Sequence, residues 1–312
     1  MTSISVIIPA HNAAAYLEQC LQSIVSQGVD NTEIIIINDA SADGTDKICR
    51  EWEHRYPFIK TLQAEHIGPS AARNLGIAEA KGEYIIFCDA DDTYYPGSFR
   101  TLIDLLNADT ECDMAIGQMS ETETTRHTHD NFKKTMSGAE ALTATLYQKK
   151  YFHNSPCAKI YRRRIFNNIQ LFRDGMRFED LEIVPRLYLN ARRITVCSES
   201  VYYYRPHEQS FMHTWSDSRF DALSATRFIL EYIGEHYPEA IKAARSRRFS
   251  ANYYILRLFK LHKNREIAEQ CIQQLHDEAL SILFDTHTRF KNKLGAAAAL
   301  LGKSFLRYIG KL

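Results

Sequence analysis

The sequence predicts an α/β fold with a mostly parallel sheet, followed by a region made of helices alone. Runs of β-branched residues alternate with helical patterns over the first 117 residues, and strand patterns end after Asp217. Strand, helix and strand at this spacing favour right-handed crossovers in a buried parallel sheet. Three aspartates follow one of the predicted strands, at the carboxyl edge where such sheets bind ligands.

Each element is predicted from its own pattern. Short apolar, β-branched runs predict strands over residues 4–8, 33–37, 84–88 and 113–116, with a weaker one over 59–62. Apolar residues at helical spacing predict helices over 13–27, 45–56 and 70–80. We expect Ser70 to cap the third helix. The polar segment 120–134 lacks an apolar period and is predicted to be a loop.

The remainder mixes strands with helices and then becomes helical. Helices are predicted near 139–147 and 180–190, and strands near 194–197 and 201–204. The last hundred residues contain four helical patterns, over 221–237, 239–262, 264–284 and 289–309. We therefore expect one domain over residues 1–215, with a first half that ends at 117, and a helical region over residues 216–312.

Composition excludes several classes of protein. The 312 residues are 45% hydrophobic and 24% charged, as in a globular protein with a sizeable core. The 38 basic and 38 acidic side chains cancel, which argues against nucleic-acid binding. The charge is unevenly distributed, because residues 1–110 hold 7 basic and 16 acidic side chains and residues 241–312 hold 14 and 5.

Seven scattered cysteines without a CxxC pair predict neither a disulfide framework nor a zinc ribbon, and they favour a reducing cytoplasm. The first ten residues lack the basic start of a signal peptide. The longest late apolar stretch, residues 294–301, is far shorter than the roughly 20 residues that cross a bilayer. We therefore expect no membrane span.

The run Tyr84-Ile-Ile-Phe-Cys-Asp-Ala-Asp-Asp contains a DxD motif. Asp89, Asp91 and Asp92 follow a buried strand, and carboxylates two residues apart can share one Mg²⁺ or Mn²⁺. The alternative is an acidic surface turn. The same run also fits the hhhDxDxT pattern of HAD-like phosphatases, in which Asp89 would be the nucleophile.

Other polar residues follow the predicted strands. Asp39 ends the second strand, where its carboxylate can either accept an N–H of a nucleobase or cap the helix near Thr45. We assign Ser41 and Asp43 to the turn and the cap of that helix. Arg73 can neutralise a nucleotide or remain solvated. No GxGxxG follows the first strand, which excludes the usual NAD and FAD sites.

Four motifs together resemble the family 2 glycosyltransferases in their order and spacing. They are Ile4-Ser-Val-Ile-Ile-Pro-Ala-His-Asn, Asn38-Asp-Ala-Ser-Ala-Asp-Gly-Thr, Ser70-Ala-Ala-Arg-Asn-Leu-Gly-Ile and Phe87-Cys-Asp-Ala-Asp-Asp. A weaker resemblance continues through Lys159-Ile-Tyr-Arg-Arg-Arg, Phe178-Glu-Asp-Leu and Tyr202-Tyr-Tyr-Arg to about residue 215. It implies a GT-A fold, with residues 1–117 as the nucleotide-binding half and 118–215 as the acceptor-binding half.

The resemblance also implies the donor site of an inverting, nucleotide-sugar-dependent enzyme. Pro9 and His11 would line the uracil pocket, where the family more often has Tyr than His. Asp39 would read the uracil N–H, although the usual Asp-Asp pair begins here with Asn38. Arg73 would contact the base and the pyrophosphate side.

The DxD residues would complete the site around Mn²⁺ or Mg²⁺. Asp89 would hold the ribose, Asp91 would bind the metal that bridges the diphosphate, and Asp92 would lie behind the metal or on the acceptor side. His207 is a further candidate for the pyrophosphate or the metal, with Asp89 as another possible ligand; His213 is a weaker one.

The family's Glu-Asp pair corresponds to Glu179-Asp180. Asp180 would be the base that deprotonates the acceptor hydroxyl, with Glu179 beside it on the acceptor. The alternative is that the pair caps a helix and interacts with its dipole.

Residues 286–312 contain six basic side chains and no acidic one. Apolar residues between them approximate one helical face, which is typical of a helix that lies on an anionic membrane surface. The alternative is packing on the domain or on another copy in a homo-oligomer.

The sequence and the resemblance thus predict a cytoplasmic enzyme that is peripheral on the inner face of the membrane. It would move a sugar from a UDP-sugar to a hydroxyl of a glycan or glycolipid acceptor. The product would be a surface polysaccharide such as capsule or lipopolysaccharide. Two alternatives remain: the HAD-like phosphatase, and a protein that binds nucleotide sugars without turnover.

Overall fold

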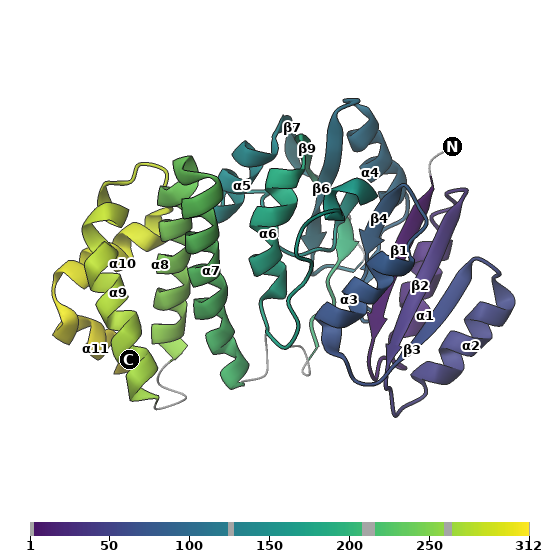
Figure 1. Ribbon diagram of the computed structural model, residues 1–312, viewed down its shortest axis with the longest axis horizontal. Coiled ribbons are helices and arrows are strands. Elements are labelled where there is room, and N and C mark those ends of the chain that lie inside the picture. Colours follow the sequence, from purple (N-terminus) through teal and green to yellow (C-terminus); the bar gives the residue numbers. More distant parts are fainter. Residues whose placement is uncertain (1–2, 124–127, 208–215, 259–263, 312) are drawn as a thin grey trace. The chain divides into compact units, whose positions relative to one another are not determined.

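The computed structural model describes residues 3–123, 128–207, 216–258 and 264–311, and it forms two compact units (Figure 1). The first unit consists of residues 1–138, 154–175 and 186–214, and the second of residues 139–153, 176–185 and 215–312. The last segment of the second unit begins at residue 215. The structure additionally groups two earlier segments with the C-terminal helices.

The first unit is built on one sheet with strand order β3-β2-β1-β4-β8-β6-β9-β5, in which β7 pairs with β9. The strands are β1 (Ile4–Ala10), β2 (Thr32–Asp39), β3 (Ile59–Ala64), β4 (Tyr84–Phe87), β5 (Thr93–Tyr94), β6 (Cys112–Ser120), β7 (Thr128–Ser137), β8 (Lys159–Arg162) and β9 (Arg193–Tyr203). The first four strands are parallel, β8 is antiparallel to β4 and β6, and β9 is parallel to β6. The parallel arrangement therefore holds for the first half, and the second half is mixed.

Helices cover this sheet. They are α1 (Leu17–Val25), α2 (Thr45–Arg55), α3 (Gly68–Glu79), α4 (Ser98–Asn107) and the short η1 (Arg163–Phe166), and α6 (Glu179–Asn190) belongs in part to each unit. Helix α3 packs on β1 and β2, and α4 packs on β6 and β9. The core of β1 and β2 is formed by isoleucine and valine side chains that are almost fully buried.

The structure corrects three local predictions. Part of the predicted loop 120–134 is strand β7, whose polar sequence is held by pairing with β9. The two short strands near 194–197 and 201–204 are one strand, β9. Ser70 does not cap α3, because this helix begins at Gly68 and Ser70 lies buried inside its first turn.

The second unit is helical. It contains most of α5 (Gly138–Leu146), then η2 (Asp217–Phe220), α7 (Asp221–His236), η3 (Pro238–Ala240), α8 (Ile241–Leu258), α9 (Arg265–Phe284), α10 (Phe290–Leu300) and α11 (Lys303–Lys311). Phe249, Leu275 and Leu306 lie in its buried core. The single helix predicted over 289–309 is two helices, because Gly302 between them has a φ of 104°. None of the described helices has the length and apolar character needed to cross a membrane.

Two helical glycines should respond in opposite ways to alanine. A Cβ at Gly76 in α3 would collide with Ile7 Cγ2 of β1, so Gly76→Ala should destabilise the protein by about 1–3 kcal/mol. A Cβ at Gly234 in α7 would meet its nearest atom at 3.8 Å, so Gly234→Ala should stabilise by about 0.5–1 kcal/mol. Thermal unfolding of both variants checks this, and a stable Gly76→Ala protein would contradict the packing of α3 on β1.

Candidate active site

The candidate site lies at the carboxyl ends of the parallel strands. Ala10 at the end of β1 is in register with Asn38 near the end of β2, and β4 pairs with β1 on its other side. Polar residues that follow each of these strands therefore reach the same edge of the sheet. Pro9, in β1, is half-buried there.

The three aspartates after β4 are crowded together. Asp92 is buried, and burial together with the charges of Asp89 and Asp91 raises its pKa to about 8. Burial, followed by the charge of Asp89, also raises the pKa of Asp91. A cation bound here would stabilise the charged forms of these crowded carboxylates.

The segment after β9 contacts this cluster. The Arg205 backbone N–H donates to Asp92 Oδ1 at 2.8 Å, and the Arg205 Nε–H donates to the Asp91 carbonyl at 3.0 Å. The His207 Nε2 lies 2.9 Å from Asp91 Oδ2, and its ring stacks on Tyr16. His207 Nδ1 is buried and has no hydrogen-bond partner among the described atoms.

This geometry fits a divalent cation. Two ligands that bind one Mg²⁺ at about 2.1 Å and at right angles are about 3 Å apart, close to the separation of the Asp91 and His207 side chains. His207 adds a nitrogen, which Mn²⁺ accepts more readily than Mg²⁺. Asp91 and His207 therefore lie close enough to share one ion.

Arg73 and Asp89, which the sequence singles out separately, form an ion pair. Arg73 Nη2 donates to Asp89 Oδ1 at 2.9 Å, and the Arg73 side chain is 7% exposed whereas that of Asp89 is 39% exposed. The guanidinium lies over the Phe172 ring, 5.6 Å from its centroid. The Asp89 backbone N–H donates to the Tyr202 hydroxyl at 3.0 Å. Asp89 is thus oriented from both sides with part of its carboxylate open to solvent.

Asp39 caps a helix, but a different one from that expected. Its carboxylate accepts the backbone N–H groups of Ile67 at 2.6 Å and Gly68 at 2.8 Å, at the start of α3. Asp43 instead accepts the N–H of Thr45, as predicted, at 2.9 Å. Each Asp39 oxygen retains a lone pair, so capping of α3 is compatible with reading a base.

His11 lies against the same residue, because its Nδ1 is 2.5 Å from the Asp39 carbonyl oxygen. A carbonyl oxygen only accepts, so Nδ1 donates this hydrogen bond, and Nε2 lies 3.1 Å from the side-chain nitrogen of Asn12. His66, which sequence reasoning missed, lies beside His11 with ring centroids 4.9 Å apart. Its position directly before Ile67 and Gly68 gives no recognisable sequence signal.

Glu179 and Asp180 belong to the second unit, in the first turn of α6. Glu179 is buried and Asp180 is half-buried, and Asp180 Oδ1 accepts the N–H of Leu181 at 2.7 Å. In the same unit, burial lowers the pKa of Arg247 to about 10, and the charge of Asp180 opposes that shift. Their assignment as base and acceptor-binding residue stays a prediction. His213 lies outside the described residues.

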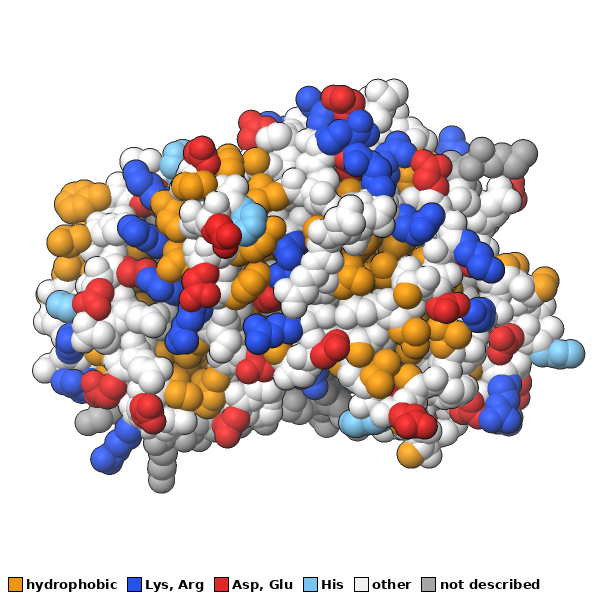
Figure 2. Space-filling view, viewed as in Figure 1, with side chains coloured by type: hydrophobic (Ala, Val, Ile, Leu, Met, Phe, Trp, Pro, Cys, Tyr) orange, Lys and Arg blue, Asp and Glu red, His pale blue; other side chains and the backbone are white. Residues whose placement is uncertain are grey.

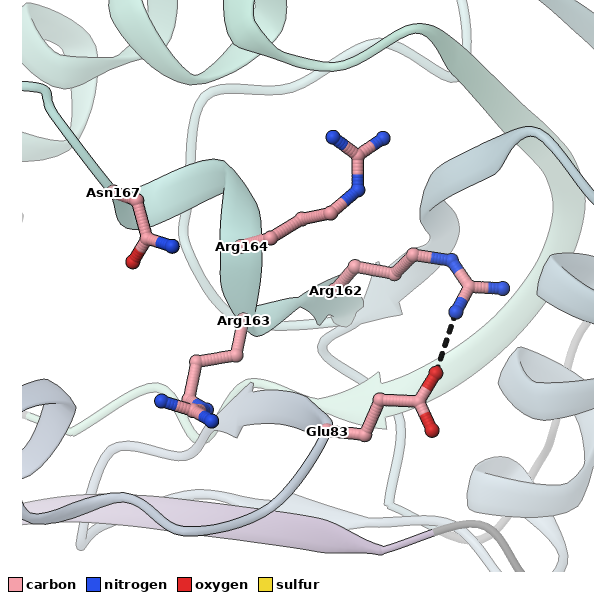
Figure 3. A pocket seen from close by; sticks show the side chains of 5 residues that line it. All are labelled: Glu83, Arg162, Arg163, Arg164 and Asn167. Carbon is pink, nitrogen blue, oxygen red and sulfur yellow. Dashed lines mark hydrogen bonds and ion pairs between the residues drawn. The ribbon is translucent and has the colours of Figure 1, made fainter.

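A basic pocket lies at the other end of β4. The pocket has a volume of about 190 Å³ and is lined by Glu83, Arg162, Arg163, Arg164 and Asn167 (Figure 3). Arg162 donates to Glu83 at 2.6 Å, and Arg164 bonds to the fully buried Asp113. Arg162 and Arg164 therefore belong to an ion-pair network, at the edge opposite the aspartates.

Comparison with known proteins identifies the family of this chain. A model described as Glycosyl transferase family 2 matches residues 5–170. The chain is 30% identical over 254 residues to the glycosyltransferase GlyG of Streptococcus pneumoniae serotype 4, covering 77% of this chain and 81% of that protein. It is 31% identical over 254 residues to YibD, described as an uncharacterized glycosyltransferase of Escherichia coli K12, covering 76% and 73%.

Another pneumococcal relative, the glycosyltransferase GlyA, is 30% identical over 230 residues. That alignment covers 70% of this chain and 33% of GlyA, so the chain spans about a third of that relative's length.

Solved structures share the fold. The crystal structure of Staphylococcus aureus TarS 1–349 in complex with UDP-GlcNAc has a TM-score of 0.76 at 22% identity and covers 99% of this chain and 90% of that chain. A mannosyltransferase of Pyrobaculum calidifontis in complex with GDP-Man and Mn²⁺ has a TM-score of 0.55 at 16% identity, with coverage of 99% and 84%. The predicted GT-A fold with C-terminal helices is confirmed. Since the family model covers more than half of the sequence, this chain belongs to Glycosyl transferase family 2 and is a glycosyltransferase.

Proposed function

We propose that this chain is an inverting enzyme that moves a sugar from a UDP-sugar to a hydroxyl of a glycan or lipid-linked glycan during synthesis of a surface polysaccharide. The supporting observation is the aspartate cluster after β4, in which His207 lies 2.9 Å from Asp91. TarS, which shares the fold, was solved with UDP-GlcNAc, and this supports a UDP-sugar as donor.

The donor would lie along the carboxyl edge of the sheet. Pro9 and His11 would line the uracil pocket, and the Asp39 carboxylate would accept the uracil N–H with a lone pair that capping leaves available. Arg73 would contact the pyrophosphate side. Its ion pair with Asp89 holds that carboxylate in a fixed direction for the ribose hydroxyls.

Asp91 and His207 would hold Mn²⁺ or Mg²⁺, with Asp89 at the edge of the site. When bound there, the ion would supply positive charge to offset that of the diphosphate and of the departing UDP. Asp92 would set the position of Asp91 from behind, because it accepts the Arg205 backbone N–H while Arg205 also donates to Asp91.

Asp180 would remove the proton from the acceptor hydroxyl as its oxygen forms a bond to the anomeric carbon. The bond between that carbon and the UDP oxygen breaks, and the configuration inverts. Glu179 would hold the acceptor beside Asp180. Arg247 lies near enough for the charge of Asp180 to act on it, and this contact would help to hold Asp180 in place.

Release of UDP from a panel of UDP-sugars tests this function. We expect release that depends on Mn²⁺ and on one donor, and that increases with a hydroxyl acceptor. Family membership favours the transferase over the phosphatase alternative. Metal-dependent UDP binding without release from any donor would instead favour the protein without turnover.

We further propose that the second unit lies on an anionic membrane surface. Four apolar side chains of this unit are largely exposed: Phe284 at the end of α9 (77%), Phe290 and Leu294 of α10 (73% and 56%), and Leu301 directly after α10 (70%). We call these four side chains the apolar face. Figure 2 shows hydrophobic side chains on the surface of this part of the chain. Lys291 lies exposed beside them. Such an exposed apolar face with basic neighbours is typical of interfacial helices.

Some of the basic side chains of residues 286–312 bind other side chains of the same unit and are not available to lipid headgroups. Arg307 donates to both carboxylate oxygens of Glu269 at 2.7 and 2.8 Å, and Lys303 bonds to Gln273. The charge that supports membrane binding is therefore that of Lys291, Lys293 and the net positive second unit.

Replacing Phe290 and Leu294 together by serine should lower the fraction of protein that sediments with phosphatidylglycerol vesicles by about tenfold or more, because two apolar side chains no longer enter the bilayer. Phe58→Ser, at a 40% exposed phenylalanine of the first unit, is the control and should sediment like the wild type. Unchanged sedimentation of the double variant would contradict the proposal. If the double variant sedimented like the wild type but formed a smaller oligomer, the apolar face would instead contact a second copy of the chain.

A further inference from the structure

The turns after three adjacent strands bring metal-binding side chains together. His11 follows β1, Asp39 ends β2 and His66 follows β3. One ligand atom from each, a ring nitrogen of either histidine and a carboxylate oxygen, all lie within 4.8 Å of one another. We propose that these three residues bind Zn²⁺ and that the bound ion excludes the uracil of the donor; this second part rests on the proposed function.

Asp39 positions both histidines. Its carboxylate accepts the N–H groups of Ile67 and Gly68, which fixes the chain directly after His66. Its carbonyl accepts the Nδ1–H of His11 at 2.5 Å. Histidines that bind metals almost always donate their other N–H to a carbonyl or a carboxylate, because this fixes the ring and its neutral tautomer. His11 already has that arrangement.

The backbone at all three turns is held in an uncommon conformation. Asn12, Ala40 and His66 have φ values of 50°, 52° and 55°, in the left-handed region that residues with a Cβ seldom adopt. Asn12 follows His11, and Ala40 follows Asp39. The surrounding structure must over-determine such a conformation, and residues of this kind cluster at ligand sites.

The chemistry of these ligands differs from that of the aspartate cluster. Two imidazoles and one carboxylate are a ligand set that Zn²⁺ uses with a fourth position open, whereas Mg²⁺ and Mn²⁺ prefer oxygen ligands. Tetrahedral ligands at about 2.1 Å from Zn²⁺ are roughly 3.4 Å apart, so the three residues must close by about an ångström. His11 and His66 are exposed and can turn by that amount, while Asp39 stays buried.

Binding of the ion and of the base would be mutually exclusive. The proposed uracil site uses His11 and the Asp39 carboxylate, and a Zn²⁺ ion on the same two side chains occupies that space and the remaining lone pair. Zn²⁺ should therefore inhibit competitively with the donor. By linkage, UDP should weaken Zn²⁺ binding by the same factor as Zn²⁺ weakens UDP binding.

The test starts with calorimetric titration of Zn²⁺ into the metal-free full chain without nucleotide. We expect a tight site, which His66→Gln weakens by about tenfold or more, since even indirect partners of a metal contribute that much. His54→Gln, at an exposed histidine of α2, should bind Zn²⁺ like the wild type, and Asp91→Asn should retain this site. Equal Zn²⁺ affinity in His66→Gln and the wild type, or loss of the site in Asp91→Asn, would overturn the proposal.

UDP titrations in the presence of Mn²⁺ then test the competition. Zn²⁺ should weaken UDP binding to the wild type by tenfold or more and leave UDP binding to His66→Gln unchanged. Tight Zn²⁺ binding that leaves UDP affinity intact would overturn the competition. Failure of the proposed function has a different result, since zinc-free protein would then not bind UDP although the Zn²⁺ site persisted.

Discussion

Replacing Asp91 by asparagine is expected to lower the kcat of sugar transfer by about a thousandfold or more, because a neutral amide is a poor ligand and several kcal/mol of charge stabilisation is lost. The asparagine keeps the shape of the side chain, so the packing of Asp92 and Arg205 around it should persist. The rate of UDP release across a Mn²⁺ titration measures the effect, and the variant should no longer respond to the ion.

Asp104→Asn is the matched control. Asp104 is 59% exposed on α4 and pairs with Arg100 one turn away, so its replacement should change neither kcat nor the Mn²⁺ response. If Asp91→Asn and Asp104→Asn retained the same activity and Mn²⁺ dependence as the wild type, the assignment of Asp91 would be wrong.

Asp180→Asn should lower kcat by about 10²–10⁴-fold, the usual contribution of a positioned base. Its affinity for UDP should stay within about twofold of the wild type, because a base that acts on the acceptor has no role in donor binding. Parallel measurement of UDP release with acceptor and of UDP binding separates the two effects.

Asp277→Asn controls for this substitution. The Asp277 carboxylate is exposed on α9 and accepts from Gln273, so the variant should behave as the wild type. Loss of UDP binding in Asp180→Asn, or an undiminished kcat, would contradict the assignment of Asp180 as the base.

The sequence predicts the fold best where burial is complete. Strands β1, β2 and β4 are short apolar runs because their consecutive side chains, which point to opposite faces of the sheet, are buried. Such runs are recognisable without tertiary information. Strand β7 has a polar sequence, and its only pairing in the described sheet is with β9. Its identity as a strand therefore depends on a partner about sixty residues away, which no local pattern contains.

The candidate site is likewise predictable from the sequence only in part. The DxD aspartates and Asp39 follow strands, so their edge of the sheet is predictable. The residue that each one contacts is not, because Asp39 caps a helix 28 residues later and Arg205 reaches Asp91 and Asp92 from the end of β9. His66 could not be identified, since its significance comes from its distance to His11.

The central claim is a metal-dependent UDP site at Asp91, and titration of UDP into the protein with and without Mn²⁺ tests it most directly. The proposed site predicts that Mn²⁺ strengthens UDP binding in the wild type and that Asp91→Ala abolishes this gain. UDP binding that survives the substitution unchanged, or no UDP binding to the wild type at all, would contradict it.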